Sequence, residues 1–373
     1  MRSRPLAPLA LAGAGAVAMA ATGAYAYHNI KTLNRYETSD ELEVYRADLE
    51  RKYLKYETLP RPVVTKVVLD AQLYPADRRL VVNGRYELRN DTKAPLAEVH
   101  VRTGDRDVEW PRLDLAGATL ASNDKKFGYR IYRFATPLAP GATATLDFTS
   151  RIWNRGFRAG SPATDVIENG TFVNNFGFAP IIGMSRQGLL SDRAQRRRQG
   201  LAPELRMAKL EDNSATVRNY IGTDWVMSDI SLTTDAAQTP IAPGNRVSDV
   251  TRGGRRTARF VSPAPILNFF SIQSAEYEVA KRNHDGVELA VYYQRGHDWN
   301  VPKMLKAMAA SLDYFRASFG PYQFNYARII EFPGYASFAQ AFAGTMPYSE
   351  SIGFNANTND PDKIDFTTYV IAH

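Results

Sequence analysis

The residue best placed to do chemistry is His373, which closes a segment with helical spacing. The pair Asp360 and Pro361 suits an N-cap followed by proline at the first helical position, and Phe366, Tyr369, Val370 and His373 then share one face. A histidine on a buried helix face is how the zinc motif H-E-x-x-H begins, in which two imidazoles four residues apart hold one ion. On spacing alone, a purely structural histidine is the better interpretation.

Other kinds of reactive site find little support in the sequence. The chain has no cysteine, which removes disulfides, thiolate ligands and cysteine nucleophiles. It has neither a G-x-S-x-G elbow nor a glycine-rich phosphate loop. The other histidines need no site: His28 follows an apolar stretch, His100 alternates with valines and should face solvent, and His284 and His297 lie in turn-like sequences.

The residues upstream of His373 resemble those of the zinc aminopeptidases related to aminopeptidase N and leukotriene hydrolase, most of all the bacterial branch fused to ABC-transporter permeases. Within residues 347–354, Glu350 matches the glutamate of the family motif Gly-Ala-Met-Glu-Asn, and Gly353 matches the glycine that follows. Residues 319–322 look like the family's turn into the catalytic domain, and residues 329–333 look like the strand that leads to the motif.

The resemblance implies a role for each candidate residue. Glu350 would bind the free α-amino group of a peptide through a charge-assisted hydrogen bond, with Gly353 beside it in the substrate-binding segment. His373 would be the first zinc ligand. The second histidine, the third ligand, the glutamate base and the catalytic tyrosine of the family are not in this sequence. We therefore expect the intact parent to be a zinc aminopeptidase, and this chain, truncated at the first histidine, to be inactive.

Two departures from the family pattern leave alternatives open. Tyr348 and Ser349 replace small and apolar residues of the motif, which affects the shape of the substrate pocket and puts aminopeptidase activity in question. A rival alignment lays residues 344–346 on Gly-Ala-Met, but it puts Pro347 in place of the glutamate. We prefer the alignment that keeps the carboxylate of Glu350.

The N-terminus carries Arg2 and Arg4 before an uncharged stretch of small and apolar residues. As a helix, residues 6–27 would span roughly 33 Å at about 1.5 Å per residue, enough for the core of a bilayer. The rival interpretation is a signal peptide cleaved after residues 24–26. The family resemblance favours a membrane anchor. Either interpretation places residues 28 onward on the extracytoplasmic side, because the arginines stay inside.

The patterning predicts a mainly β N-terminal sandwich followed by the start of an α/β, thermolysin-like catalytic domain. Short strand-like runs between turns argue for the sandwich, and Asn83-Gly84 predicts a hairpin. Residues 156–215 look like an irregular insertion, whereas residues 302–319 have helical spacing. Thr38 opens a capping box whose helix should pack on the following domain. The predicted regions are an anchor or signal segment (1–28), a linker helix (29–60), the sandwich (61–283) and the truncated catalytic domain (284–373).

The charge of the chain gives no sign of a nucleic-acid partner. The formal net charge is +7 and the pI is about 9.4, but the basic residues are spread along the sequence. The one dense cluster, Arg193 with Arg196, Arg197 and Arg198, has no interleaved aromatic residues and is typical of a solvated loop.

We therefore expect the N-terminal part of a membrane-anchored zinc aminopeptidase that hydrolyses peptides from the amino end. The expected partners are a peptide substrate, the cell membrane, and permease or ABC-transporter subunits. The alternative is a non-catalytic extracytoplasmic binding module of a transporter, in which the sandwich and residues 156–215 would contact a peptide or partner. A weaker third interpretation is a secreted solute-binding protein.

Overall fold

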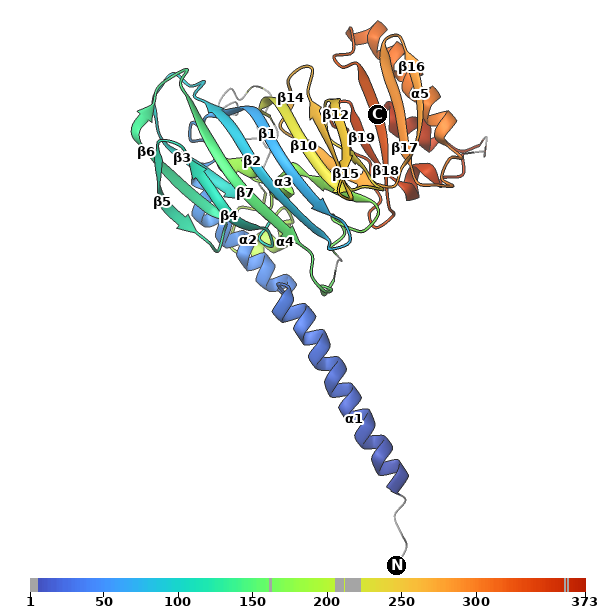
Figure 1. The fold of residues 1–373 in the computed structure, drawn as a ribbon. Coiled ribbons are helices and arrows are strands. Elements are labelled where there is room, and N and C mark those ends of the chain that lie inside the picture. The colour runs from blue at the N-terminus through green and yellow to red at the C-terminus, as the bar shows by residue number, and fades with distance from the viewer. Residues whose placement is uncertain (1–5, 161–162, 205–210, 212–222, 359, 361) are drawn as a thin grey trace, which may run out of the picture.

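The computed structural model describes residues 6–160, 163–204, 211, 223–358, 360 and 362–373. Within these residues the chain is mostly β-sheet, preceded by one long apolar helix that projects from the body (Figure 1). The N-terminal helix α1 (Leu6–Tyr27) continues into the short π-helix η1 (His28–Leu33). The span from Pro8 to Leu33 is long and apolar enough to cross a membrane by length and composition, a property it shares with signal sequences.

The linker helix forms where the sequence predicts it. Helix α2 (Ser39–Tyr53) begins after Thr38, whose hydroxyl accepts from the backbone N–H of Glu41 while the Glu41 side chain accepts from the Thr38 N–H. The 3₁₀ turn η2 (Leu54–Tyr56) follows. Leu49 and Tyr53 are buried against Tyr129 of the sandwich and its neighbours, so the prediction that this helix packs on the following domain is confirmed.

The body of the first domain is two β-sheets with a shared apolar core. The larger sheet has the order β12-β13-β10-β1-β2-β7-β4, with β14 paired to β10, and β1 and β10 run parallel. The second sheet has the order β5-β6-β3-β9. The strands are β1 (Val63–Tyr74), β2 (Arg79–Arg89), β3 (Leu96–Thr103), β4 (Glu109–Leu115), β5 (Ala118–Asp124), β6 (Tyr129–Leu138), β7 (Thr143–Trp153), β9 (Pro180–Ile182), β10 (Trp225–Asp235), β12 (Asn245–Arg252), β13 (Arg255–Val261) and β14 (Ile266–Leu267).

Two local predictions for this domain are wrong. Asn83 and Gly84 lie inside β2 and not in a hairpin, because Gly84 pairs with Phe148 and a Cβ there would come 2.1 Å from the Phe148 ring. The glycine is needed for this close approach. His100 does not face solvent: its side chain is 8% exposed and its Nδ1 lies 2.9 Å from the Tyr129 hydroxyl.

The predicted irregular insertion, residues 156–215, forms helices and strands, and one of its strands joins two later strands in a small sheet. A three-stranded sheet has the order β11-β15-β8, and the elements are β8 (Thr171–Asn174), α3 (Asn175–Phe178), α4 (Arg193–Arg198), β11 (Thr239–Ile241) and β15 (Ser271–Ala275). The arginine cluster is a helix and not a solvated loop. The buried Arg196 guanidinium binds both carboxylate oxygens of Glu50 at 2.8 Å, and Arg198 pairs with Glu43, so α4 is fastened to α2. Residues 205–210 and 212–222 of the predicted insertion lie outside the described residues.

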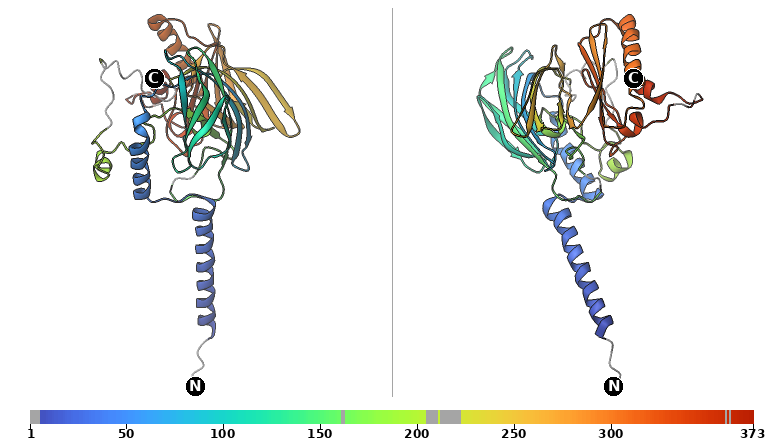
Figure 2. Two further views of the ribbon diagram at one scale, coloured as in Figure 1. Left: turned by 90° about the vertical axis from the view of Figure 1, so that its left-hand side faces the viewer. Right: turned by 45° about the vertical axis from the view of Figure 1, so that its right-hand side comes forward.

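A mixed sheet with helices on it forms the C-terminal part (Figure 2). Its order is β16-β17-β18-β19, with β16 antiparallel and the other three parallel. Strand β16 precedes the predicted boundary at residue 284 but belongs to this sheet. The elements are β16 (Glu278–His284), β17 (Val287–Tyr293), α5 (Val301–Phe319), β18 (Tyr326–Phe332), β19 (Thr345–Ser349), the π-helix η4 (Glu350–Phe354) and α6 (Phe366–Ala372).

The last helix differs from its prediction in both start and orientation. Helix α6 begins after Asp365, whose carboxylate accepts from the Thr368 N–H, and not after Asp360. The residues that α6 buries are Thr367 and Ile371, whereas Tyr369 is 56% exposed. His373 is also exposed. Within the described residues, α6 buries the face that carries Thr367 and Ile371, whereas the face of Phe366, Tyr369 and His373 that the sequence predicts to be buried is exposed.

Candidate functional site

The most unusual side chain of the C-terminal part is Glu331, a carboxylate that is 0% exposed on the central strand β18. Its Oε2 accepts the Gln294 backbone N–H at 2.6 Å, and its Oε1 is hydrogen-bonded to Nδ1 of His297. Its own carbonyl accepts from the Tyr277 hydroxyl at 2.9 Å. Burial raises the pKa of Glu331, and the imidazole of His297 partly opposes this shift. Keeping a carboxylate here is costly unless it is well paired.

Glu350 approaches the same ring nitrogen of His297 as Glu331 does. Strands β18 and β19 are parallel neighbours, with Phe332 opposite Ser349, so the end of β19 brings Glu350 close to the Glu331 pair. Nδ1 of His297 is 4.0 Å from Oε2 of Glu350. The three ligand atoms of this cluster lie within 4.8 Å of one another. The nearby charge of Glu350 also contributes to the raised pKa of Glu331.

The carboxylate of Glu350 is oriented by backbone. Its Oε1 accepts the Gly334 N–H at 2.7 Å. A Cβ on Gly334 would come 2.9 Å from that oxygen, so only glycine leaves the carboxylate in place. Among the described residues, none donates a hydrogen bond to Oε2, and the side chain is 28% exposed. Glu350 therefore has one oxygen, Oε1, held by the backbone, and a second oxygen, Oε2, available to a cation from outside.

Gly353 supports this segment by making room for Tyr348. A Cβ on Gly353 would lie 2.7 Å from two atoms of the Tyr348 ring. The Gly353 carbonyl accepts from the Asn300 amide at 2.8 Å, which ties η4 to the start of α5. Tyr348 is 1% exposed, its hydroxyl has no partner among the described residues, and burial raises its pKa to about 12. The geometry gives Gly353 a packing role, and its role towards a substrate stays a prediction.

His373 stands apart from this cluster. It lines a pocket of about 320 Å³ together with Tyr348, Met346 and residues 339–341. Its ring stacks on Tyr369 with centroids 6.0 Å apart. Neither of the two groups of described residues that could hold a metal includes it. An imidazole is a suitable zinc ligand, but zinc sites use three or four protein ligands. The described residues thus supply one donor at this place and do not by themselves fit a zinc ion.

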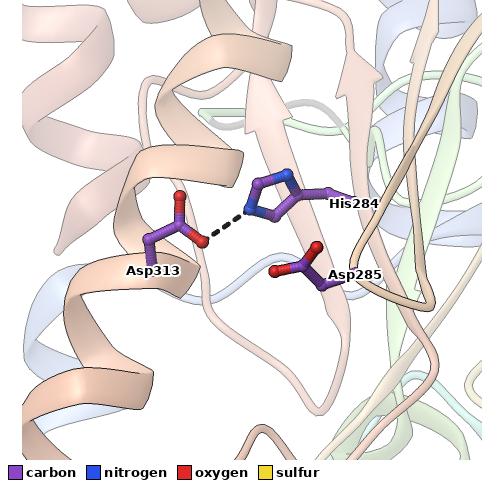
Figure 3. A group of neighbouring side chains, drawn as sticks. All are labelled: His284, Asp285 and Asp313. Carbon is purple, nitrogen blue, oxygen red and sulfur yellow. Dashed lines mark hydrogen bonds and ion pairs between the residues drawn. The ribbon is translucent and has the colours of Figure 1, made fainter.

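The second histidine cluster is explained by folding. His284 Nε2 lies 2.7 Å from a carboxylate oxygen of Asp313 on α5, with Asp285 beside it (Figure 3). Asp285 has a φ of 48°, in the turn between β16 and β17, and pairs with Arg316 of the same helix at 3.2 Å. These contacts fasten the hairpin to α5. His284 itself is the last residue of β16 and the turn consists of Asp285 and Gly286, so the turn interpretation of His284 is incomplete.

Sequence reasoning placed Glu350 in the site but missed Glu331 and His297. The turn interpretation of His297 was incomplete, because its ring binds Glu331, 34 positions away on strand β18. One signal was available: Glu331 is the sole acid in the apolar strand Tyr326–Phe332, and a charged residue inside such a run asks for a partner.

Comparisons with known proteins identify the fold. No family model matches the chain, and no curated protein matches it. Among solved structures, a point mutant of an M1 zinc metallopeptidase from Deinococcus radiodurans aligns with TM-score 0.52 and 12% identity, over 80% of this chain and 64% of that one. The unmutated enzyme from the same organism gives 0.51 and 13%, over 80% and 63%. The chain has the fold of these M1 metallopeptidases.

A further similar structure is a two-domain M1 zinc metallopeptidase mutant bound to L-tryptophan. It aligns with TM-score 0.53 and 13% identity over 84% of this chain and 64% of that one. The chain therefore spans somewhat less than two thirds of the length of the structures it resembles. At these identities the likeness concerns the fold.

Proposed function

We propose that this chain belongs to a membrane-anchored zinc aminopeptidase and supplies the subsite that binds the free α-amino group of a peptide. The observation that carries the proposal is the carboxylate of Glu350, fixed by the Gly334 N–H through one oxygen and available through the other. The fold likeness to M1 zinc metallopeptidases supports it. Two of the similar structures hold L-tryptophan and L-arginine, amino acids that each carry an α-ammonium group.

His297 and Glu331 would act behind Glu350 as positioning residues. A substrate ammonium at Oε2 of Glu350 would lie beside an imidazole already hydrogen-bonded to a buried carboxylate. The buried negative charge of Glu331, when ionised, offsets any positive charge on the ring and keeps the subsite favourable to a cation. A charge-assisted hydrogen bond to Glu350 would then fix which peptide bond reaches the metal.

The metal would be zinc, with His373 as its first ligand and further ligands following it in the parent chain. Bound zinc would supply Lewis-acid activation of water in the thermolysin-like catalytic domain that we propose begins at residue 284. Helix α1 would anchor the protein with residues 28 onward outside the cytoplasm, in association with an ABC-transporter permease.

Zinc content of the full-length protein tests this assignment. We expect about one zinc ion per wild-type molecule and a loss of zinc in the His373→Ala variant. The same loss should not occur in His28→Ala, which removes an exposed imidazole that belongs to neither group of possible metal ligands. Retention of zinc by His373→Ala would remove His373 from the metal site.

A second candidate function is a non-catalytic binding module of a transporter. The observation that favours it is the pair Tyr348 and Ser349, which replace small and apolar residues of the family motif and are both buried. This module would bind amino-terminal peptides at Glu350 but would never cleave them. A full-length protein that binds an aminoacyl ligand without holding zinc would establish this alternative.

A further inference from the structure

Exposed aromatic residues surround the C-terminal end of α1. Tyr25 and Tyr27 are 64% and 66% exposed at the end of the apolar helix. Two more large rings lie at the end of β7 and on the loop that follows it: Trp153, the last residue of β7, is 46% exposed and Phe157 is 43% exposed. The rings of Tyr25 and Phe157 have centroids 5.8 Å apart. The end of the helix and the loop after β7 thus meet through the rings of Tyr25 and Phe157.

The loop is held in this position by η1. The Asn34 amide donates to the carbonyls of Arg155 at 2.8 Å and Phe157 at 3.2 Å. Gly156 has a φ of 57°, and a Cβ there would come 2.1 Å from the side-chain oxygen of Asn29. A glycine therefore permits a close approach that keeps the loop beside the helix end. The contact is built into the fold.

Basic side chains accompany the rings. The Arg155 guanidinium lies over the Trp153 ring at 4.8 Å, and Lys31 lies over the Tyr36 ring at 4.3 Å. Arg78, in the turn between β1 and β2, donates to the Gly156 carbonyl at 2.7 Å. None of the described carboxylates forms an ion pair with Lys31, Arg78 or Arg155. Arg158 of the same segment is paired with Asp107 at 3.1 Å, so the positive charge of this aromatic surface comes from Lys31, Arg78 and Arg155.

We propose that residues 25–31 and the loop 153–158 form a lipid-contacting band by which the β-sandwich rests on the headgroups of the membrane that α1 spans. Trp and Tyr favour the level of the headgroups, with the ring in the apolar boundary and the polar edge in water. Lys and Arg there attract anionic lipids. The apolar stretch of α1 stops at Tyr27, so the headgroup level falls where the band lies.

The arrangement of the molecule agrees with this placement. Every view shows α1 leaving the body at one end, with the whole body beyond the C-terminal end of the helix (Figures 1 and 2). A single helix would leave the body free to swing about the junction that follows it. A second contact through Trp153 and Phe157 would fix the tilt of the sandwich relative to the membrane. The inference rests on α1 being an anchor, which the proposed function also assumes, but it does not depend on peptidase activity.

Quenching of tryptophan fluorescence by brominated lipids tests the lipid-contacting band. The chain has four tryptophans, of which Trp225 and Trp299 are exposed away from the band, at 58% and 78%. The full chain would be reconstituted in nanodiscs whose phosphatidylcholine and phosphatidylglycerol carry bromine near the headgroup. We expect Trp153→Phe to remove more than half of the wild-type quenching and the matched control Trp225→Phe to leave it unchanged.

Two outcomes would overturn the proposal, and a third would overturn its electrostatic part. Equal quenching in the Trp153→Phe and Trp225→Phe variants would show that Trp153 does not touch lipid and that the band is free for a protein partner. If quenching is the same with phosphatidylcholine alone and does not change in Arg155→Glu, the basic residues do not contribute to the lipid contact. A mature N-terminus near Tyr27 would show that α1 is removed as a signal, which defeats the membrane contact but leaves Glu350 and the peptidase proposal untouched.

Discussion

Replacing Glu350 by glutamine should weaken the binding of a free α-amine selectively. The substitution keeps the shape of the side chain and its bond to the Gly334 N–H, but removes the charge at Oε2. A hydrogen bond to a charged group contributes about 1.5–3 kcal/mol. Because the side chain is 28% exposed and water screens it, the lower part of this range applies. About 1.5–2 kcal/mol corresponds to roughly a 10- to 30-fold loss of affinity.

Isothermal titration of the protein with L-phenylalanine amide measures this loss. The matched ligand is N-acetyl-L-phenylalanine amide, which has no ammonium group and whose weak binding should not change in Glu350→Gln. The matched variant is Glu276→Gln, which removes the same charge from an exposed position outside the cluster. If Glu350→Gln binds the amide within twofold of wild type, or loses both ligands equally, Glu350 is not the amine subsite.

Three further changes test packing and buried charge, two of them beside the site and one between α2 and α4. Gly353→Ala should lower the free energy of unfolding by about 1–3 kcal/mol, because the new methyl group overpacks the Tyr348 ring. The control Gly177→Ala, whose Cβ would meet only Val173 at 3.6 Å, should change it by less than about 1 kcal/mol. Equal melting temperatures for the two variants would contradict the close contact at Gly353. Burial raises the pKa of Glu331 above that of the unfolded chain, so the folded state holds the extra proton and stability falls as pH rises from about 4.5 to the raised value. Glu331→Gln should remove this fall, so the melting temperature of the variant should rise relative to that of wild type as pH rises. A difference in melting temperature that stays constant with pH would show that Glu331 does not titrate in this range. Arg196→Met should lower the free energy of unfolding by about 3–5 kcal/mol, because it leaves Glu50 buried and unpaired. The double variant that adds Glu50→Leu should recover much of this loss. Additive losses in denaturant titrations would argue against a coupled pair.

The sequence predicted those elements whose signals are local. The capping box at Thr38 and the helical spacing of residues 302–319 depend on neighbours within one or two turns, and α2 and α5 formed as expected. Glu350 was proposed from a contiguous motif, and its role stays a prediction. In each case the residues that decide the structure lie next to one another in the chain.

The predictions that were wrong depended on distant contacts. Asn83-Gly84 carries a hairpin signal, but Phe148, far along the chain, needs the space above that glycine. The start of α6 was misplaced because Asp360 and Asp365 are both acceptable caps, and packing of Ile371 on the sheet selects the second. Glu331 and His297 meet only through the order of strands β17 and β18. Such pairings depend on sheet register, which single-residue patterns do not specify.

The most direct test of the account is whether cleavage by the full-length protein requires a free amino terminus and Glu350. Hydrolysis of an aminoacyl reporter would be compared with that of its N-acetylated form, with and without a zinc chelator, in wild type and Glu350→Gln. We predict chelator-sensitive cleavage of the free form alone, strongly reduced in Glu350→Gln and unaffected in Glu276→Gln. Cleavage of both forms at similar rates, or full activity in Glu350→Gln, would contradict the proposed aminopeptidase subsite.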